Sequence, residues 1–257
     1  MILKKSVFSL LLLMSFALQA QINFDEKKAD TLEIKAQEQL HFNKKQLIIP
    51  AVFITYGVVG LGSDFLKSVN SEIREEVNEN IDSKFTIDDF TLYLPVASLY
   101  GLSALGIKGK NNLRDKTIIL ATSSLIMGIT VGTLKKTTKV ERPDGSSFDS
   151  FPSGHTAVAF MGAELMYQEY KDVSPWYGIA GYAVAAGTGA FRIYNNRHWL
   201  TDVVAGAGIG ILSAKAAYWL YPTVNGLLSS KKHKNRKSVF VPYYDGKQLG
   251  FGMVSSF

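Results

Sequence analysis

The sequence contains no cysteine. This absence excludes disulfide bonds, and it excludes any metal site built on thiolate ligands. If a protein without cysteine is exported, it has to fold without covalent cross-links. No internal repeat is evident either, and a length of 257 residues indicates one domain that is large enough to bury a sizeable core.

Acidic residues are outnumbered by basic ones, which gives a formal net charge of +6 and a pI of about 9.2. A basic balance is compatible with nucleic-acid binding, but here the lysines cluster at the edges of apolar segments. That placement favours positive-inside anchoring in a membrane, or a phosphate site, over a nucleic-acid-binding face. We therefore expect no nucleic-acid partner.

The N-terminus has the pattern of an export signal. Lys4 and Lys5 form a charged start, and an apolar region follows that ends in a small residue, Ala20. Residues 1–20 are therefore predicted to be a signal peptide, with an uncleaved signal anchor as the alternative. Residues 21–45 are polar and charged, which indicates a short amphipathic helix or a loose N-terminal arm.

Residues 46–222 consist largely of segments with few or no charges. Most of these segments are close to the length of a short membrane helix, near the threshold of roughly 18 apolar residues. Their glycine, alanine and serine content suits close helix packing in lipid or in a dense soluble bundle. The pattern predicts an all-α helical bundle, with five or six membrane-spanning helices. The segments are Leu47–Gly62, Thr91–Ile107, Thr117–Leu134, Thr156–Tyr170, Pro175–Phe191 and Trp199–Tyr221.

Two regions outside these segments differ in character. Residues 64–90 are acidic and helical in pattern, and we interpret four glutamates as a solvated face: Glu72, Glu75, Glu76 and Glu79. Residues 223–257 form a basic linker and a tail, in which two apolar runs flank Asp245-Gly246. An Asp-Gly pair between apolar runs predicts a short C-terminal β-hairpin.

Three polar clusters interrupt the apolar pattern, at Lys135–Pro143, Ser150–Thr156 and Phe191–Asp202. They supply fixed cations, a glycine turn that opens a helix, two histidines and a carboxylate. Displacement at a phosphate ester needs groups of these kinds, because the non-bridging oxygens must be neutralised, a nucleophile must attack in line and the leaving oxygen needs a proton.

Each residue type in the clusters has a place in this chemistry. Lys135, Arg142 and Arg192 can supply the cations, since the planar fork of arginine can bind two oxygens at once. The Pro-Ser-Gly turn opens an apolar helix, so the free N–H groups there and the hydroxyl of Ser153 can hold an anion, and Gly154 lets the backbone approach closely.

His198 and Asp202 are four residues apart at the start of the last helix, and therefore lie on one face. There the carboxylate can accept from one ring nitrogen and leave the other as a nucleophile. His155 is then the natural general acid. A phosphohistidine intermediate needs no metal, and the sequence offers no cluster of oxygen ligands for magnesium and only a weak zinc site, so we expect neither a metal nor another cofactor.

The arrangement resembles the superfamily of type 2 phosphatidic acid phosphatases and vanadium haloperoxidases, and in particular its bacterial membrane lipid phosphatases. The family pattern is a Lys, six residues and Arg-Pro, then Pro-Ser-Gly-His, then Ser-Arg, five residues, a His, three residues and an Asp. The matching residues are Lys135, Arg142, Pro143, Pro152, Ser153, Gly154, His155, Arg192, His198 and Asp202.

The resemblance implies an α-helical bundle with His198 as nucleophile, His155 as general acid and Asp202 as the partner of the nucleophile. It also implies a set of phosphate contacts, which come from Lys135, Arg142, Ser153, Gly154 and Arg192. Phe191 stands where the family usually has a serine, so one hydroxyl near the phosphate is missing. The loop between the first two clusters is short, which would leave the site open to a bulky or membrane-held substrate.

Charged loops indicate an orientation. The connection around residues 108–116 and the stretch at residues 231–237 are rich in lysine and arginine, so both are expected on the cytoplasmic side. The three clusters then lie at the periplasmic ends of the helices. The predicted location is the bacterial inner membrane with the active site facing the periplasm. A cleaved signal would leave residue 21 in the periplasm, however, whereas six spans with a cytoplasmic C-terminus must start in the cytoplasm, so the number of spans stays open.

The leading hypothesis is a lipid phosphatase whose partners are membrane lipids and a lipid phosphate substrate. Candidate substrates are phosphatidate, phosphatidylglycerophosphate, undecaprenyl pyrophosphate and the phosphates of lipid A. A soluble periplasmic acid phosphatase of broad specificity is the alternative, favoured by a mean hydropathy of only +0.07. A vanadium haloperoxidase, or a non-catalytic phosphate-binding protein that would not need His198 with Asp202, is more remote. The sequence leaves the oligomeric state open.

Overall fold

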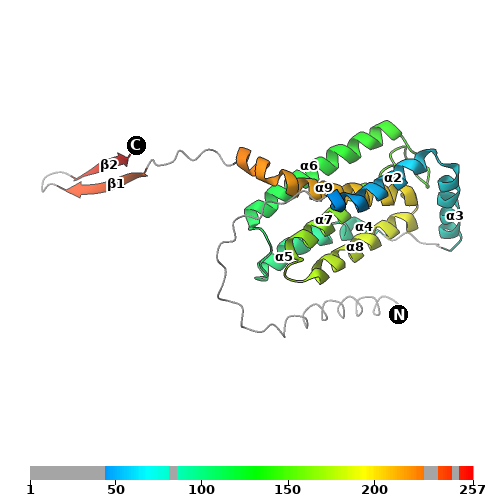
Figure 1. The fold of residues 1–257 in the computed structure, drawn as a ribbon, viewed down its shortest axis with the longest axis horizontal. Helices are drawn as coiled ribbons and strands as arrows, with labels where there is room; N and C mark the ends of the chain where they lie inside the picture. Colours follow the sequence, from blue (N-terminus) through cyan, green and yellow to red (C-terminus); the bar gives the residue numbers. More distant parts are fainter. Residues whose placement is uncertain (1–43, 81–85, 229–236, 245–248, 257) are drawn as a thin grey trace. The chain divides into compact units, whose positions relative to one another are not determined.

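The computed structural model describes residues 44–80, 86–228, 237–244 and 249–256 (Figure 1). The predicted signal peptide and nearly all of the predicted N-terminal arm lie outside these residues. Within them the protein is a helical bundle, as the apolar pattern predicts. The elements are η1 (Lys44–Leu47), α2 (Ile48–Gly62), α3 (Asp64–Asn80), α4 (Asp88–Thr91), α5 (Leu94–Ala104), α6 (Leu113–Thr138), α7 (Gly154–Tyr170), α8 (Pro175–Tyr194), α9 (Leu200–Leu228), β1 (Lys237–Tyr244) and β2 (Leu249–Ser256).

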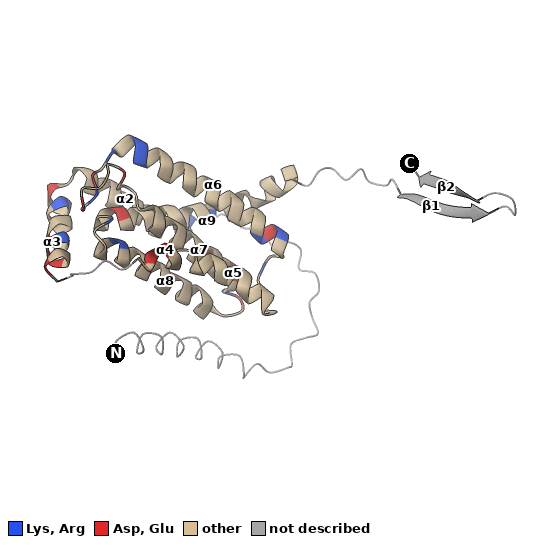
Figure 2. Ribbon diagram, turned by 180° about the vertical axis from the view of Figure 1, so that it is seen from behind, with Lys and Arg blue, Asp and Glu red and all other residues tan. Residues whose placement is uncertain are grey.

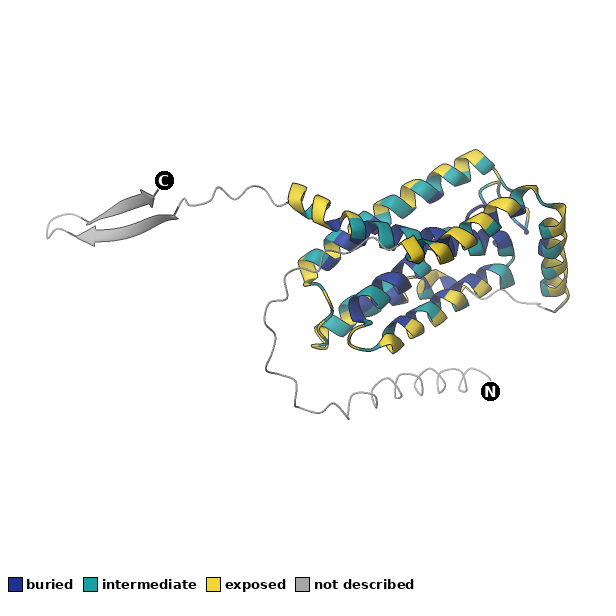
Figure 3. Ribbon diagram, viewed as in Figure 1, coloured by how far each residue is buried: buried dark blue, intermediate teal, exposed yellow. Residues whose placement is uncertain are grey.

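Helices α7 and α9 form the centre of the bundle. Helix α7 packs against α5, α8 and α9, and α9 also packs against α2 and α6; Figure 3 shows both helices buried along much of their length. Glycines on α9 let the backbones touch, because a Cβ on Gly206 would stand 2.5 Å from the carbonyl oxygen of Ser153. A Cβ on Gly210 would lie even closer to the carbonyl oxygen of Ala157. This contact fixes the start of α7 beside the start of α9, where two of the polar clusters lie.

Among the residues that the structure describes, three stretches are long and apolar enough to cross a membrane, judged by length and composition: Lys44–Gly62, Leu113–Thr138 and Leu200–Leu228. Their most apolar windows are 17%, 22% and 61% buried in the protein, respectively, so α2 and α6 face outward while α9 is central. Charges on α6 gather near its two ends and leave the middle of the helix apolar (Figure 2). Helix α5 is a shorter apolar helix. A total of five or six spans stays a prediction.

The boundaries differ from the sequence prediction at two places. Helix α9 continues through Pro222 to Leu228, beyond the residue at which the helical domain is predicted to end. The acidic region 64–90 contains α3, on which the glutamates predicted to be solvated are exposed, and the first residues of the short α4, in which Asp88 is only 1% exposed. At the C-terminal end, β1 and β2 pair antiparallel, with Lys237 opposite Ser256.

Candidate active site

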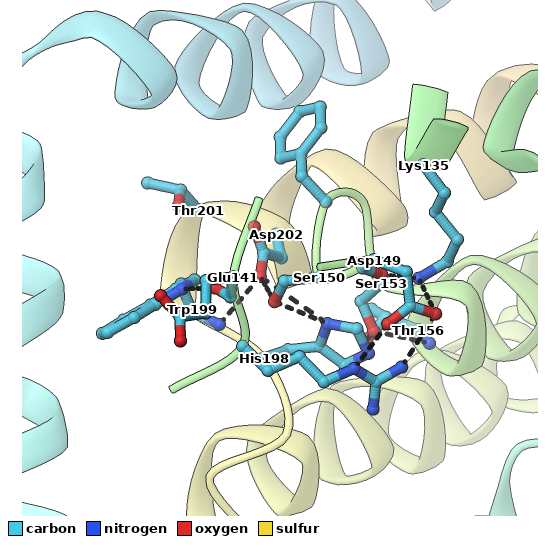
Figure 4. A network of polar contacts seen from close by, with 12 residues as sticks. Lys135, Glu141, Asp149, Ser150, Ser153, Thr156, His198, Trp199, Thr201 and Asp202 are labelled. Atoms are coloured by element: carbon cyan, nitrogen blue, oxygen red, sulfur yellow. Dashed lines mark hydrogen bonds and ion pairs between the residues drawn. The ribbon is translucent and has the colours of Figure 1, made fainter. Parts of the chain in front are cut away.

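The three polar clusters come together at one end of the central helices (Figure 4). Lys135 lies in the last turn of α6, which ends where Lys139 adopts a left-handed conformation with φ of 48°. The loop that follows leads to Ser153, the N-cap of α7. The third cluster spans the end of α8 and the first turn of α9. Segments far apart in the sequence therefore supply one site.

A serine hydroxyl lies between the paired histidine and aspartate. Nδ1 of His198 is 3.6 Å from Oδ2 of Asp202, which is too long for a direct hydrogen bond. The Oγ of Ser150 donates to that same Oδ2 at 2.5 Å and lies 3.4 Å from Nδ1 of His198. Figure 4 shows this hydroxyl between the ring and the carboxylate. The arrangement engages Nδ1 and leaves Nε2 as the nitrogen that is available for attack.

Asp202 is held in place by the backbone around it. Its Oδ2 accepts from the N–H of Trp199 at 2.9 Å, and its main-chain oxygen accepts from the N–H of Ser153 at 3.0 Å. The carboxylate is 1% exposed, and its Oδ1 is buried without a hydrogen-bond partner among the described residues. Burial lowers the pKa of His198 to about 4, although Asp202 opposes that shift. His198 is therefore neutral near pH 7, which is the protonation state of a nucleophile.

Arg142 and Lys135 both bind an aspartate that the motif analysis did not single out. The guanidinium of Arg142 donates to the two carboxylate oxygens of Asp149, at 2.8 and 3.2 Å. The ammonium of Lys135 is 3.8 Å from the same carboxylate and donates to the main-chain oxygen of Asp149. Hydrogen bonds from Arg142 and then Ser147 hold the pKa of Asp149 well below its usual range. The carboxylate of Asp149 thus binds the two cations, Arg142 and Lys135, that the sequence assigns to phosphate.

The start of α7 is capped as the Pro-Ser-Gly turn predicts. The Oγ of Ser153 accepts from the N–H of Thr156 at 3.4 Å and lies 2.9 Å from the hydroxyl oxygen of Thr156. Gly154 is the first residue of the helix. A Cβ at Gly154 would meet, among the described residues, only Val131 at an ordinary 3.9 Å. The fold itself does not require glycine here, so close approach of a ligand remains the reason that the sequence suggests for it.

His155 and Arg192 converge on a pair of carboxylates from α4. Nε2 of His155 lies 2.9 Å from Oδ1 of Asp89. Nη1 of Arg192 donates to Oδ2 of Asp88 at 2.6 Å and is 3.7 Å from Oδ1 of Asp89. Burial and then the charge of Arg192 lower the pKa of His155 below its usual value, and the hydrogen bond with Asp89 opposes this shift.

His155, Arg192 and the two carboxylates of α4 line a cavity of about 270 Å³. Its lining includes the predicted general acid and both predicted phosphate-binding arginines, together with acidic, amide and hydroxyl side chains. Arg197, interpreted from the sequence as a surface or interfacial cation, also faces the cavity and donates to Asp144 at 3.2 Å. The lining residues are Thr86, Asp88, Asp89, Arg142, His155, Arg192, Asn195 and Arg197.

Asp88, Asp89 and His155 offer ligand atoms that lie within 4.8 Å of one another, the spacing of a possible metal site. The guanidinium of Arg192 occupies the same place, 2.6 Å from one carboxylate and 3.7 Å from the other. A fixed positive charge at these distances opposes a divalent cation. The donor set therefore fits an arginine partner better than a metal ion.

Sequence reasoning did not assign roles to four residues of this site: Asp88, Asp89, Asp149 and Ser150. Ser150 stands inside the second cluster, so its position was a usable signal. Asp149 directly precedes that cluster. Asp88 and Asp89 resemble the other acidic residues of region 64–90, and no local pattern separates a buried carboxylate from a solvated one.

A profile of the PAP2 superfamily matches residues 116–225. Lipid A 1-phosphatase of Porphyromonas gingivalis is 40% identical over 155 residues, which cover 60% of this chain and 35% of that protein. Bacitracin transport permease protein BcrC of Bacillus licheniformis is 34% identical over 77 residues, which cover 30% of this chain and 36% of that protein. The chain thus spans only about a third of the length of the curated relatives that it matches.

Two solved structures are also similar. The crystal structure of Aquifex aeolicus LpxE has a TM-score of 0.43 and 24% identity, and covers 58% of this chain and 94% of its own. A PAP2-type phosphatidylglycerolphosphate phosphatase from Bacillus subtilis has a TM-score of 0.42 and 20% identity, and covers 74% of this chain and 99% of its own.

Proposed function

We propose that the protein, whose residues 116–225 match a profile of the PAP2 superfamily, is a metal-independent phosphatase that hydrolyses lipid phosphates through a phosphohistidine. The observation that carries this proposal is the Ser150 hydroxyl between His198 and Asp202. It engages Nδ1 of a buried, neutral imidazole and so leaves Nε2 with a free lone pair. An imidazole held in this way serves as a nucleophile or a base, and a binding protein has no need of it.

In the proposed first step, Nε2 of His198 attacks the phosphorus and forms a P–N bond while the P–O bond to the alcohol breaks. His155 gives its proton to the leaving oxygen, which departs as the neutral alcohol. In the second step, a water molecule gives a proton to His155 and its oxygen attacks the phosphorus. The P–N bond breaks, inorganic phosphate leaves, and both histidines return to their starting states. Ser150 and Asp202 stabilise the His198 ring while it carries positive charge.

The proposed phosphate site consists of Lys135, Arg142, Arg192, the hydroxyl of Ser153 and the N–H groups at Gly154. The cations stabilise the charge on the equatorial oxygens of the transition state, and the start of α7 contributes its helix dipole. Because the Asp149 carboxylate binds both prongs of Arg142, a substrate phosphate must displace it to bind in the same way.

Two observations support a lipid phosphate as the substrate. The relative from P. gingivalis is named for a phosphatase that acts on lipid A, and α2 and α6 present apolar faces of membrane-spanning length at the outside of the bundle. We propose that the protein lies in the bacterial inner membrane with its site toward the periplasm. Candidate substrates are phosphatidate, phosphatidylglycerophosphate, undecaprenyl pyrophosphate and lipid A.

The test is phosphate release from these four lipids and from p-nitrophenyl phosphate, in detergent, by the wild type, His198→Ala and Asp202→Ala. We expect release that resists EDTA, is inhibited by vanadate and disappears in His198→Ala. Acid-labile phosphate that stays attached to wild-type protein after rapid quenching would identify the intermediate. Unchanged activity in His198→Ala would refute the assignment of the nucleophile.

The same assay separates the alternative function. A soluble periplasmic acid phosphatase would hydrolyse p-nitrophenyl phosphate, would leave the lipids intact and would be extracted without detergent. A non-catalytic phosphate-binding protein would bind phosphate and release none from any ester.

A further inference from the structure

Helix α4 carries two adjacent carboxylates that the proposed mechanism does not use. Asp88 is 1% exposed, and the side chain of Asp89 is 53% exposed and faces the cavity of the site. The pair lies about a hundred residues before the third polar cluster in the sequence, yet it contacts residues of the second and third clusters. A buried carboxylate is costly unless it is paired, so the partners of Asp88 and Asp89 indicate what they do.

Asp88 holds the end of α8 in place. Its Oδ2 accepts from Nη1 of Arg192 at 2.6 Å, and its Oδ1 accepts from Nδ2 of Asn195 at 2.9 Å. Nε of Arg192 is buried and has no hydrogen-bond partner among the described residues. Nη1 of the guanidinium thus donates to a carboxylate, while the N–H at Nε has no acceptor among the described residues. A buried guanidinium with an unused donor is expected to bind an anionic ligand.

Asp89 contacts His155, the proposed general acid. Its Oδ1 lies 2.9 Å from Nε2 of His155 and 3.7 Å from Nη1 of Arg192. When Nε2–H of His155 donates to this carboxylate, the ring is fixed in one orientation, and Nδ1 is the nitrogen left to face a substrate. The carboxylate also opposes the lowering of the pKa of His155 by burial and by Arg192, and so favours the protonated imidazole, which is the form that can give up a proton.

We propose that Asp89 is the positioning residue of the acid step, orienting His155 so that its Nδ1–H reaches the leaving oxygen, and that Asp88 fixes Arg192 for the phosphate. The inference rests on the proposed phosphatase function and adds two roles to it. It predicts different defects for two neighbouring carboxylates, because one acts through the leaving group and the other acts through the phosphate.

The leaving group separates the two roles. A nitrophenolate departs without a proton, whereas an alkoxide from a lipid needs one from a general acid. The test compares kcat/KM for phosphatidate and for a nitrophenyl phosphate that carries a lipid-length alkyl chain. We use kcat/KM because it reports the first chemical step even if hydrolysis of the phosphohistidine limits kcat.

For Asp89→Asn we expect kcat/KM on phosphatidate to fall about 100-fold, the lower range for loss of a general acid, with a change of less than about 3-fold on the nitrophenyl ester. His155→Ala should show the same pattern, and Asp89→Glu should recover part of the loss on phosphatidate. Asp88→Asn should instead lower kcat/KM on both esters by a similar factor and weaken inhibition by vanadate. Glu75→Gln, which changes an exposed carboxylate of α3, is the matched control and should leave both values unchanged.

Two results would overturn the inference while leaving the proposed function intact. An equal loss on both esters in Asp89→Asn would mean a structural role, and no loss on either would mean no role. Loss of wild-type activity in EDTA would mean that a metal ion takes part, and would overturn both the inference and the metal-independent function proposed above. If the wild type releases phosphate from neither ester, or if His198→Ala remains active, the proposed function itself fails.

Discussion

The hydroxyl of Ser150 donates a 2.5 Å hydrogen bond to Oδ2 of Asp202. Its oxygen is also 3.4 Å from Nδ1 of His198, so it can accept from the ring while it donates to the carboxylate. A histidine and an aspartate four residues apart suggest a direct pair, but at 3.6 Å the contact runs through this serine. The orientation of His198 therefore depends on a residue from the loop before α7.

Removal of this hydroxyl should impair the nucleophile without unfolding the protein. We expect Ser150→Ala to lower kcat/KM about 10- to 100-fold, which corresponds to the roughly 1.5–3 kcal/mol of a hydrogen bond to a charged group. Ser150→Thr keeps the hydroxyl and should retain more activity. Equal losses in the two variants, with unchanged thermal unfolding, would show that packing at this position matters rather than the hydrogen bond.

Asp149 should compete with the substrate for its cations. Its carboxylate occupies both prongs of Arg142 and lies near Lys135, so Asp149→Asn removes an anion that phosphate would have to displace. We expect vanadate to inhibit the variant at a several-fold lower concentration than the wild type. Weaker inhibition would mean that Asp149 instead holds Arg142 in position. Glu75→Gln is again the control for a simple change of net charge.

The pH dependence should reflect the buried nucleophile. Because burial lowers the pKa of His198 to about 4, the free protein keeps a neutral ring down to that pH and loses the nucleophile only below it. We expect the acidic limb of log kcat/KM to have its midpoint near 4 rather than near 6.5. A midpoint near 6.5 that moves in no variant of Asp202 or Ser150 would contradict a buried, neutral His198.

The same shift has a consequence for stability. Between about pH 6.5 and 4, the unfolded chain binds a proton at this position and the folded protein does not, so the contribution of His198 favours unfolding as the pH falls. The comparison of wild type with His198→Gln in thermal unfolding at several pH values isolates this contribution. The difference between the two should change through that interval and level off below about pH 4.

Gly206 should be intolerant of a side chain because it sets the contact between α7 and α9. A Cβ there would stand 2.5 Å from the carbonyl oxygen of Ser153, which is backbone and has little freedom to move. We expect Gly206→Ala to destabilise the protein by about 1–3 kcal/mol, as overpacking does, and to reduce activity by shifting the start of α7. Gly128→Ala is the matched control, since in the described part of the chain nothing lies within 4 Å of its added Cβ.

The sequence alone determined the helical architecture and most of the residues that meet at the site. Apolar segments of helical length are a local property, because a helix buries or exposes a continuous stretch of chain. The spacing of His198 and Asp202 is likewise local, since residues four apart share one face of a helix. The resemblance of three ordered motifs to a known superfamily is confirmed by the profile match over residues 116–225.

Only the tertiary structure decided how these residues are held. Asp88 and Arg192 are 104 positions apart, and nothing in the local pattern distinguishes Asp88 from the solvated acidic residues of α3. Ser150 gains His198 and Asp202 as partners from the start of α9, and Asp89 gains His155 and Arg192 from the placement of α4 against α7 and α8. Helix geometry fixes which residues of one segment lie together. The desolvated contacts between segments depend instead on how the whole bundle packs, and those contacts set the charge and orientation of the proposed catalytic groups.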